Sequence, residues 1–293
     1  MRSTKRNLVY KCRLSWALAA ICAALLLSAE SANAAPILYV SDDAGRIARV
    51  DVVTGEVEII GNTGVPLTDI AFDTNGNLFG ISFDDFYSID LTTAASATLI
   101  GRHGISNANA LTFGPNNTLY AAGFDVDSAL YRVDPETGLA SSLGNTGVAS
   151  AGDLAFNGGQ LYLAALDFSN VTAPFQLVRI DLASDLASVV NSQSVLPIVN
   201  VVGLATGDDG MLYGVSNTGR LILVDLVNGA SILPLPLDVF ESSQSFSSGA
   251  SALPVAPELV PVPEPSTILL VGAGLLAAIR QRRRASPQIQ GPI

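Results

Sequence analysis

A leucine followed by an aromatic residue recurs along the chain, and this repeat restricts the fold more than any other feature. The pairs are Leu38-Tyr39, Leu78-Phe79, Leu119-Tyr120, Leu161-Tyr162 and Leu212-Tyr213, at spacings of 40, 41, 42 and 51 residues. After each pair comes a predicted strand that ends in aspartate, at Asp51, Asp90, Asp134, Asp181 and Asp225. We expect these aspartates to accept hydrogen bonds from backbone N–H groups of the Gly- and Asn-rich turns that follow. Four short strands in a repeat of about 42 residues are typical of a β-propeller blade.

The two ends of the repeat array predict how the ring closes. The first repeat begins at Leu38 without an innermost strand, whereas Gly249–Leu253 follows the fifth repeat where an inner strand belongs. If this last strand completes the first blade, no sheet edge stays open. The sequence therefore predicts an all-β fold, a five-bladed β-propeller of four-stranded blades, over residues 35–254. A solenoid with open ends is the alternative.

Residues 1–34 have the three parts of a secretory signal peptide. A basic start (Arg2 to Arg13) precedes an apolar stretch (Trp16 to Leu27) and the small-residue site Ala32-Asn33-Ala34, so cleavage is expected between Ala34 and Ala35. Both cysteines, both lysines and the only tryptophan lie in this segment. The exported domain would therefore have no disulfide, no thiol nucleophile and no amine for Schiff-base chemistry.

The exported domain is strongly acidic. Residues 35–261 hold six arginines and twenty-four Asp and Glu, and 6 − 24 gives a net charge of −18. Such a surface repels nucleic acid and anionic lipid and attracts cations. A nucleic-acid function is therefore excluded.

Acidic residues concentrate in the loops expected on one face of the propeller. The loops contain Asp42, Asp43, Asp84, Asp85, Asp125, Asp127 and Asp167, and Asp69 and Asp153 begin two inner strands near the mouth of the central channel. Carboxylate oxygens suit Ca²⁺, so all of these except Asp167 are candidate ligands. The alternative is that they are solvated carboxylates that keep an exported protein soluble. No cofactor is required by the sequence.

No residue is predicted to be catalytic. His103 is the only histidine and no GxSxG motif accompanies it, so a serine hydrolase and a zinc site are disfavoured, and a loop residue is the simpler interpretation. A carboxylate-dependent hydrolase of the glycosidase type, acting from the acidic face, stays open because it needs only two acids in a cleft.

The C-terminal region divides into a Pro-rich linker (255–265), a short apolar segment with an arginine cluster (266–284) and a tail (285–293). Thr267 to Ile279 would span about 20 Å as a transmembrane helix, less than the roughly 30 Å of the hydrocarbon core. The arginines would stay on the cytoplasmic side. A buried core helix is the alternative, which four arginines at the end of the segment disfavour.

This region resembles the PEP-CTERM sorting signal of Gram-negative bacteria. The resemblance rests on Val262, Pro263, Glu264, Pro265, Ser266 and Thr267, on the apolar span, and on Arg280, Arg282, Arg283 and Arg284. The tail after the arginines is longer than in typical members. The resemblance implies export, transient retention in the inner membrane and processing by an exosortase. It also implies a cell-surface or extracellular-matrix location, with exopolysaccharide or other surface proteins as partners of a binding or structural module.

Overall fold

The fold was obtained as a computed structural model, which describes residues 35–125, 129–166, 175–182, 188–195, 201–226, 229–232 and 247–253. The chain separates into two units, residues 1–254 and 255–293, and all described residues belong to the first. The predicted signal peptide and the predicted C-terminal helix lie outside the described residues. Within the described ranges, no helix is long and apolar enough to cross a membrane.

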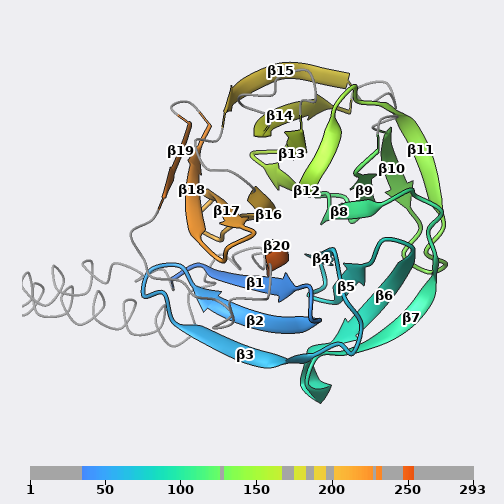
Figure 1. The fold of residues 1–293 in the computed structure, drawn as a ribbon, viewed down its shortest axis with the longest axis vertical. Coiled ribbons are helices and arrows are strands. Elements are labelled where there is room, and N and C mark those ends of the chain that lie inside the picture. The colour runs from blue at the N-terminus through green and yellow to red at the C-terminus, as the bar shows by residue number, and fades with distance from the viewer. Residues whose placement is uncertain are drawn as a thin grey trace, which may run out of the picture. The chain divides into compact units, whose positions relative to one another are not determined.

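Five antiparallel sheets of four strands surround a central axis, which confirms the predicted five-bladed propeller (Figure 1). From the innermost strand outward, blade 1 consists of β20 (Ser247–Ala252), β1 (Ile37–Asp42), β2 (Arg46–Asp51) and β3 (Val57–Asn62). Blade 2 consists of β4 (Asp69–Phe72), β5 (Leu78–Ile81), β6 (Asp85–Asp90) and β7 (Ser96–Arg102), with the 3₁₀ turn η1 (Leu91–Thr93) between its outer strands.

The other three blades follow the same order. Blade 3 consists of β8 (Ala108–Phe113), β9 (Leu119–Gly123), β10 (Ala129–Val133) and β11 (Ala140–Asn145). Blade 4 consists of β12 (Ala149–Asn157), β13 (Gln160–Leu166), β14 (Phe175–Asp181) and β15 (Ser188–Val195). Blade 5 consists of β16 (Val201–Thr206), β17 (Leu212–Ser216), β18 (Leu221–Asp225) and β19 (Gly229–Ile232).

The ring closes as the sequence predicts. β20 comes last in the chain but is the inner strand of blade 1, where it pairs antiparallel with β1 and sets Ala250 opposite Val40. The first and last strands of the propeller therefore share one sheet. The solenoid alternative is wrong because the first blade has its inner strand.

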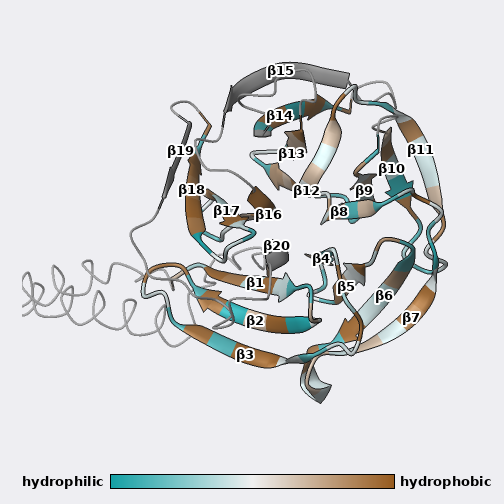
Figure 2. Cartoon of the chain, viewed as in Figure 1, coloured by the Kyte–Doolittle hydropathy of each residue, from teal (hydrophilic) through white to brown (hydrophobic). Residues whose placement is uncertain are grey.

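The Leu–aromatic repeat is explained by the contacts between blades. Its five leucines begin or lie in the second strand of each blade and are at most 2% exposed. Five separate apolar clusters fill the spaces between neighbouring blades, one for each pair and including the closing pair of blades 5 and 1. Figure 2 shows apolar residues on strands throughout the ring. The apolar faces of each blade are thus covered by the two neighbouring blades. Every blade therefore needs the same buried leucine.

The strand-ending aspartates have the predicted role in three turns. Asp51 Oδ1 accepts hydrogen bonds from the N–H groups of Val53 and Thr54, both at 2.8 Å. Asp90 accepts from the N–H and hydroxyl of Thr92, and Asp134 from the Glu136 N–H and the Thr137 hydroxyl. These bonds favour the ionised carboxylate and lower the pKa of all three aspartates.

Candidate functional site

Corresponding residues of the five inner strands meet at the propeller axis. On each inner strand, one residue pairs across the sheet with the second residue after the repeat leucine. These five inner-strand residues are Ile70, Leu111, Leu154, Leu204 and Ala250. The residues directly before them are Asp69, Ala110, Asp153, Gly203 and Gly249. The axis is therefore surrounded by two acids and three of the smallest residues.

Asp69 joins blades 2 and 3. Its Oδ1 accepts a hydrogen bond from the N–H of Ile70 at 2.7 Å, and its Oδ2 accepts one from the N–H of Leu111 at 2.6 Å. Both amides lie on inner strands, and the carboxyl group is fully buried. The side chain therefore bonds β4 to β8.

Asp153 joins the other three blades. Its Oδ1 accepts from the N–H of Leu154 at 2.5 Å, and its Oδ2 accepts from the N–H groups of Leu204 at 2.5 Å and Ala250 at 3.4 Å. These amides belong to blades 4, 5 and 1. Together the two carboxyl groups accept hydrogen bonds from the corresponding amide of every inner strand.

The two acids also bond to each other. Burial raises the pKa of both carboxyl groups, and the neighbouring Asp153 with its hydrogen bond raises that of Asp69 further. Two buried carboxylates in contact cannot both ionise at low cost, so the pair holds a proton. Asp153 accepts three amide hydrogen bonds and Asp69 accepts two, so we infer that Asp153 is the better-stabilised anion and Asp69 the donor.

The proton makes the pair sensitive to alkali. The folded-state pKa lies above the unfolded-state pKa near 4, so the protonated pair stabilises the fold, and this contribution is fully present at a pH below the unfolded-state pKa. The contribution is lost as the pH rises through the folded-state pKa. The pair is therefore expected to weaken the ring as it loses its proton.

The small residues at the axis leave room for this pair. A Cβ atom added to Gly249 would collide with the side chain and backbone of Asp69. One added to Gly203 would lie 2.8 Å from Cβ of Ala250. Because the two carboxyl groups have no exposed surface, the central channel is closed to solvent at this level.

The loop acids of the same face have protein partners. Asp42 is buried, forms an ion pair with Arg46 at 2.7 Å and accepts the N–H groups of Ala44 and Arg46. Arg102 lies between Asp84 and Asp85, at 3.8 and 3.5 Å.

Of the other predicted calcium ligands, Asp43 is exposed, Asp125 is half-buried and Asp127 lies outside the described residues, as does the further loop acid Asp167. Asp69 and Asp153 are brought together, as described above. Among the residues that the structure describes, no group of three or more His, Cys, Asp and Glu is arranged to hold a metal ion. Calcium binding by the loop acids stays a prediction.

His103 has a structural environment. It is buried, its Nδ1 accepts the N–H of Ile105 at 3.0 Å, and its Nε2 lies 3.2 Å from the carbonyl oxygen of Ser82. Burial lowers its pKa, so the neutral ring predominates. Both ring nitrogens are engaged by backbone groups of two adjacent loops, which agrees with the simpler interpretation.

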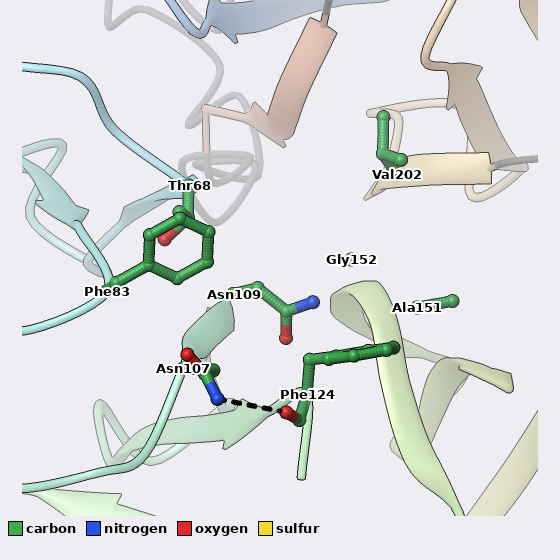
Figure 3. A pocket seen from close by; sticks show the side chains of 8 residues that line it. All are labelled: Thr68, Phe83, Asn107, Asn109, Phe124, Ala151, Gly152 and Val202. Atoms are coloured by element: carbon green, nitrogen blue, oxygen red, sulfur yellow. Dashed lines mark hydrogen bonds between the residues drawn. The ribbon is translucent and has the colours of Figure 1, made fainter.

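A pocket lies at the mouth of the channel, on the face that bears the acidic loops (Figure 3). Its volume is about 440 Å³, and it is lined by Thr68, Phe83, Asn107, Asn109, Phe124, Ala151, Gly152 and Val202. Thr68 and Gly152 directly precede Asp69 and Asp153, so the buried acid pair lies beneath it. None of these eight described residues is ionisable.

β-Bulges in three inner strands contribute to the pocket. The pairing register shifts at Asn109 in β8, at Ala151–Asp153 in β12 and at Val202 in β16. A bulge redirects side chains and is common beside binding sites. The pocket is therefore built by corresponding irregularities in blades 3, 4 and 5.

Two exposed phenylalanines and one asparagine amide determine the apolar and hydrogen-bonding surface of the pocket. Phe83 is 55% exposed and Phe124 is 43% exposed, each in the loop that follows the second strand of its blade. Nδ2 of Asn109 donates to the carbonyl oxygen of Ser150 at 3.3 Å, whereas its Oδ1 is buried without a hydrogen-bond partner among the described residues. Asn107 Nδ2 donates to the carbonyl oxygen of Phe124 (Figure 3).

The pocket was not predicted from the sequence. Phe-Asp occurs at residues 72–73, 83–84 and 124–125, and only the last two follow the second strand of a blade. The acids of these two dipeptides are in the predicted acidic loops, whereas their aromatic residues line the pocket.

Comparison with known proteins agrees with the C-terminal resemblance. Residues 261–284 match the family described as the PEP-CTERM protein-sorting motif. The chain therefore carries this sorting motif, which implies an exported protein that is sorted at the membrane. No curated protein matches the sequence.

Solved structures that are similar to this chain have low sequence identity to it. A chain of a nidogen/laminin complex is 17% identical, with 75% of this chain and 81% of that chain covered and a TM-score of 0.49. A gluconolactonase from Xanthomonas campestris is 12% identical, with 69% and 78% covered and a TM-score of 0.45. Virginiamycin B lyase from Staphylococcus aureus is 13% identical, with 71% and 73% covered and a TM-score of 0.42.

Proposed function

We propose that the chain is a cell-surface or matrix-associated binding propeller that is delivered by its PEP-CTERM motif. It is exported by the signal peptide, retained transiently in the inner membrane and processed near Pro263–Pro265 by an exosortase. Its partners after release are exopolysaccharide or other surface components. The sorting motif supports the delivery, and the chemistry of the channel mouth supports binding.

The single observation that carries the binding role is the state of the acids at the axis. A glycosidase needs two carboxyl groups about 5–10 Å apart, on either side of a substrate. Asp69 and Asp153 instead contact each other, have no exposed surface and accept backbone hydrogen bonds. The residues that the structure describes around the pocket above them include no ionisable group. The channel mouth is therefore suited to binding without hydrolysis.

Co-sedimentation tests the binding role. The protein is recovered from the surface of cells that possess an exosortase and is mixed with exopolysaccharide purified from the same cells. We expect it to sediment with the polymer. Recovery of all the protein in the supernatant at every polymer concentration would contradict a polysaccharide-binding role.

Mass spectrometry of the C-terminus tests the delivery. We expect surface protein to end near Pro263–Pro265 and a Glu264→Ala variant to keep its C-terminal segment and stay with the inner membrane. Surface protein whose peptides run through Ile279 would refute processing at this motif.

A further inference from the structure

We propose that the pocket of Asn109, Phe83 and Phe124 binds one uncharged sugar residue of a glycan. This assignment rests on the proposed binding function and names its site and the chemistry of its ligand. The size of the pocket fits a small ligand, since small-molecule sites occupy roughly 300–1,000 Å³ and this one is about 440 Å³.

The unsatisfied oxygen of Asn109 requires a hydrogen-bond donor. A buried polar atom without a partner is costly, and nearly all such atoms in proteins are paired. The Nδ2 bond to Ser150 is long, at 3.3 Å, so little holds the amide in its present orientation. Because the terminal torsion of asparagine is soft, the amide can turn its Oδ1 into the pocket. A ligand hydroxyl can then donate to it.

The two phenylalanines supply an apolar wall at the rim. Both rings are about half exposed, although large apolar side chains of a soluble domain are usually covered. They come from corresponding loops of neighbouring blades, and Figure 3 shows both beside Asn109. A ligand with C–H groups on one face and hydroxyls on its edge would cover the rings and satisfy the amide, and a pyranose ring has this form.

The charge around the pocket selects for a neutral ligand. Among the described residues that line the pocket none is ionisable, and the nearby Asp84 and Asp85 are both within 4 Å of Arg102. An anionic sugar would be repelled by the net acidic surface and would meet no cation among these lining residues. A cationic ligand would find no carboxylate among them either.

The position of the acid pair determines the side from which the ligand enters. The buried acid pair lies beneath the pocket, so a glycan approaches from the loop face. At about 440 Å³ the pocket has room for a small ligand such as one sugar residue.

The experiment measures binding of the processed, cell-derived protein to neutral and uronic-acid oligosaccharides with defined terminal sugars. Wild-type protein is expected to prefer the neutral oligosaccharides. The double variant Phe83→Ala/Phe124→Ala is expected to bind at least about tenfold more weakly, and Asn109→Leu about three- to tenfold more weakly. Asn116→Leu, an exposed change in the β8–β9 turn of the opposite face, and Leu99→Ala, on the outer strand β7, are the controls and should bind as wild type.

The outcomes separate this assignment from the proposed function. Equal binding by the wild type and the pocket variants would overturn the pocket but leave a binding propeller. A preference for uronic acids would overturn the neutral pocket. Absence of binding to every oligosaccharide, together with retained co-sedimentation with exopolysaccharide, would also overturn the pocket, whereas loss of both would overturn the proposed function as well. Because both phenylalanines are exposed, the double variant should keep the wild-type melting temperature, which shows that it folds.

Discussion

Replacement of Asp153 by alanine tests the role of the acid pair in holding the ring together. The substitution removes the acceptor of three buried amides, two of them bonded at 2.5 Å and the third at 3.4 Å. Each buried N–H that loses its partner costs about 1–3 kcal/mol, so the two short bonds alone give about 2–6 kcal/mol. Domains of this size are stable by only about 5–15 kcal/mol.

The expected effect is large enough to measure by thermal unfolding. At about 2–4 °C per kcal/mol, a loss near 4 kcal/mol lowers the melting temperature by about 12 °C. Asp51→Ala is the matched control, because Asp51 also accepts two amide hydrogen bonds but in an exposed turn where water can replace it. Its expected cost is below about 1 kcal/mol. If Asp153→Ala melted within about 2 °C of Asp51→Ala, the argument that the pair bonds the blades would be wrong.

Three further perturbations have defined outcomes. As the pH rises from about 4 through the raised pKa of the pair, the wild type should lose stability relative to Asp69→Asn. The asparagine keeps a donor toward Asp153 but has no proton to lose. Parallel curves of unfolding free energy against pH, measured by chemical denaturation, would contradict this. Arg46→Ala should destabilise the protein by about 1–3 kcal/mol, because it leaves the buried Asp42 without its cation. Arg49→Ala should change the unfolding free energy by less than about 0.5 kcal/mol, because the pair of Arg49 with Glu58 is exposed. Equal effects of the two substitutions would refute the distinction. Gly249→Ala should destabilise by about 1–3 kcal/mol through collision with Asp69, and an unchanged denaturation midpoint would show that the axis has spare room.

The fold was predictable because each blade repeats the same physical requirement. A leucine buried between neighbouring blades and an aspartate at the end of the third strand recur in every repeat, so they are visible without any long-range information. Closure was predictable because the first repeat has no inner strand and Gly249–Leu253 has no other sheet to join. These features depend on local sequence and on the need to cover sheet edges.

The candidate site was predictable only in part. Asp69 and Asp153 were expected near the channel mouth, and the structure places them buried at the axis beneath the pocket. Their mutual contact depends on which side chains the inner strands direct to the axis. Gly203 and Gly249 make this contact fit, and the sequence does not indicate that they face the acids. Asn109 was missed because its direction depends on a bulge in β8, which no local pattern indicates.

The arginine that pairs with the buried Asp42 is close to it in the sequence. Arg46 lies four residues after Asp42 across a tight turn, so a cation for this acid was present in the sequence. Asp42 was grouped with the other loop acids by composition alone. The structure separates it from them because Asp42 is buried and Asp43 is exposed.

The central claim is that this propeller binds surface polysaccharide without cleaving it. The most direct measurement is the release of reducing ends from the cells' own exopolysaccharide by the processed protein, over hours and at a concentration at which the protein sediments with the polymer. We expect the protein to sediment with the polymer and to release no new reducing ends. New reducing ends that accumulate in proportion to the protein, and that disappear with Asp69→Asn, would contradict it and show that the acid pair is catalytic.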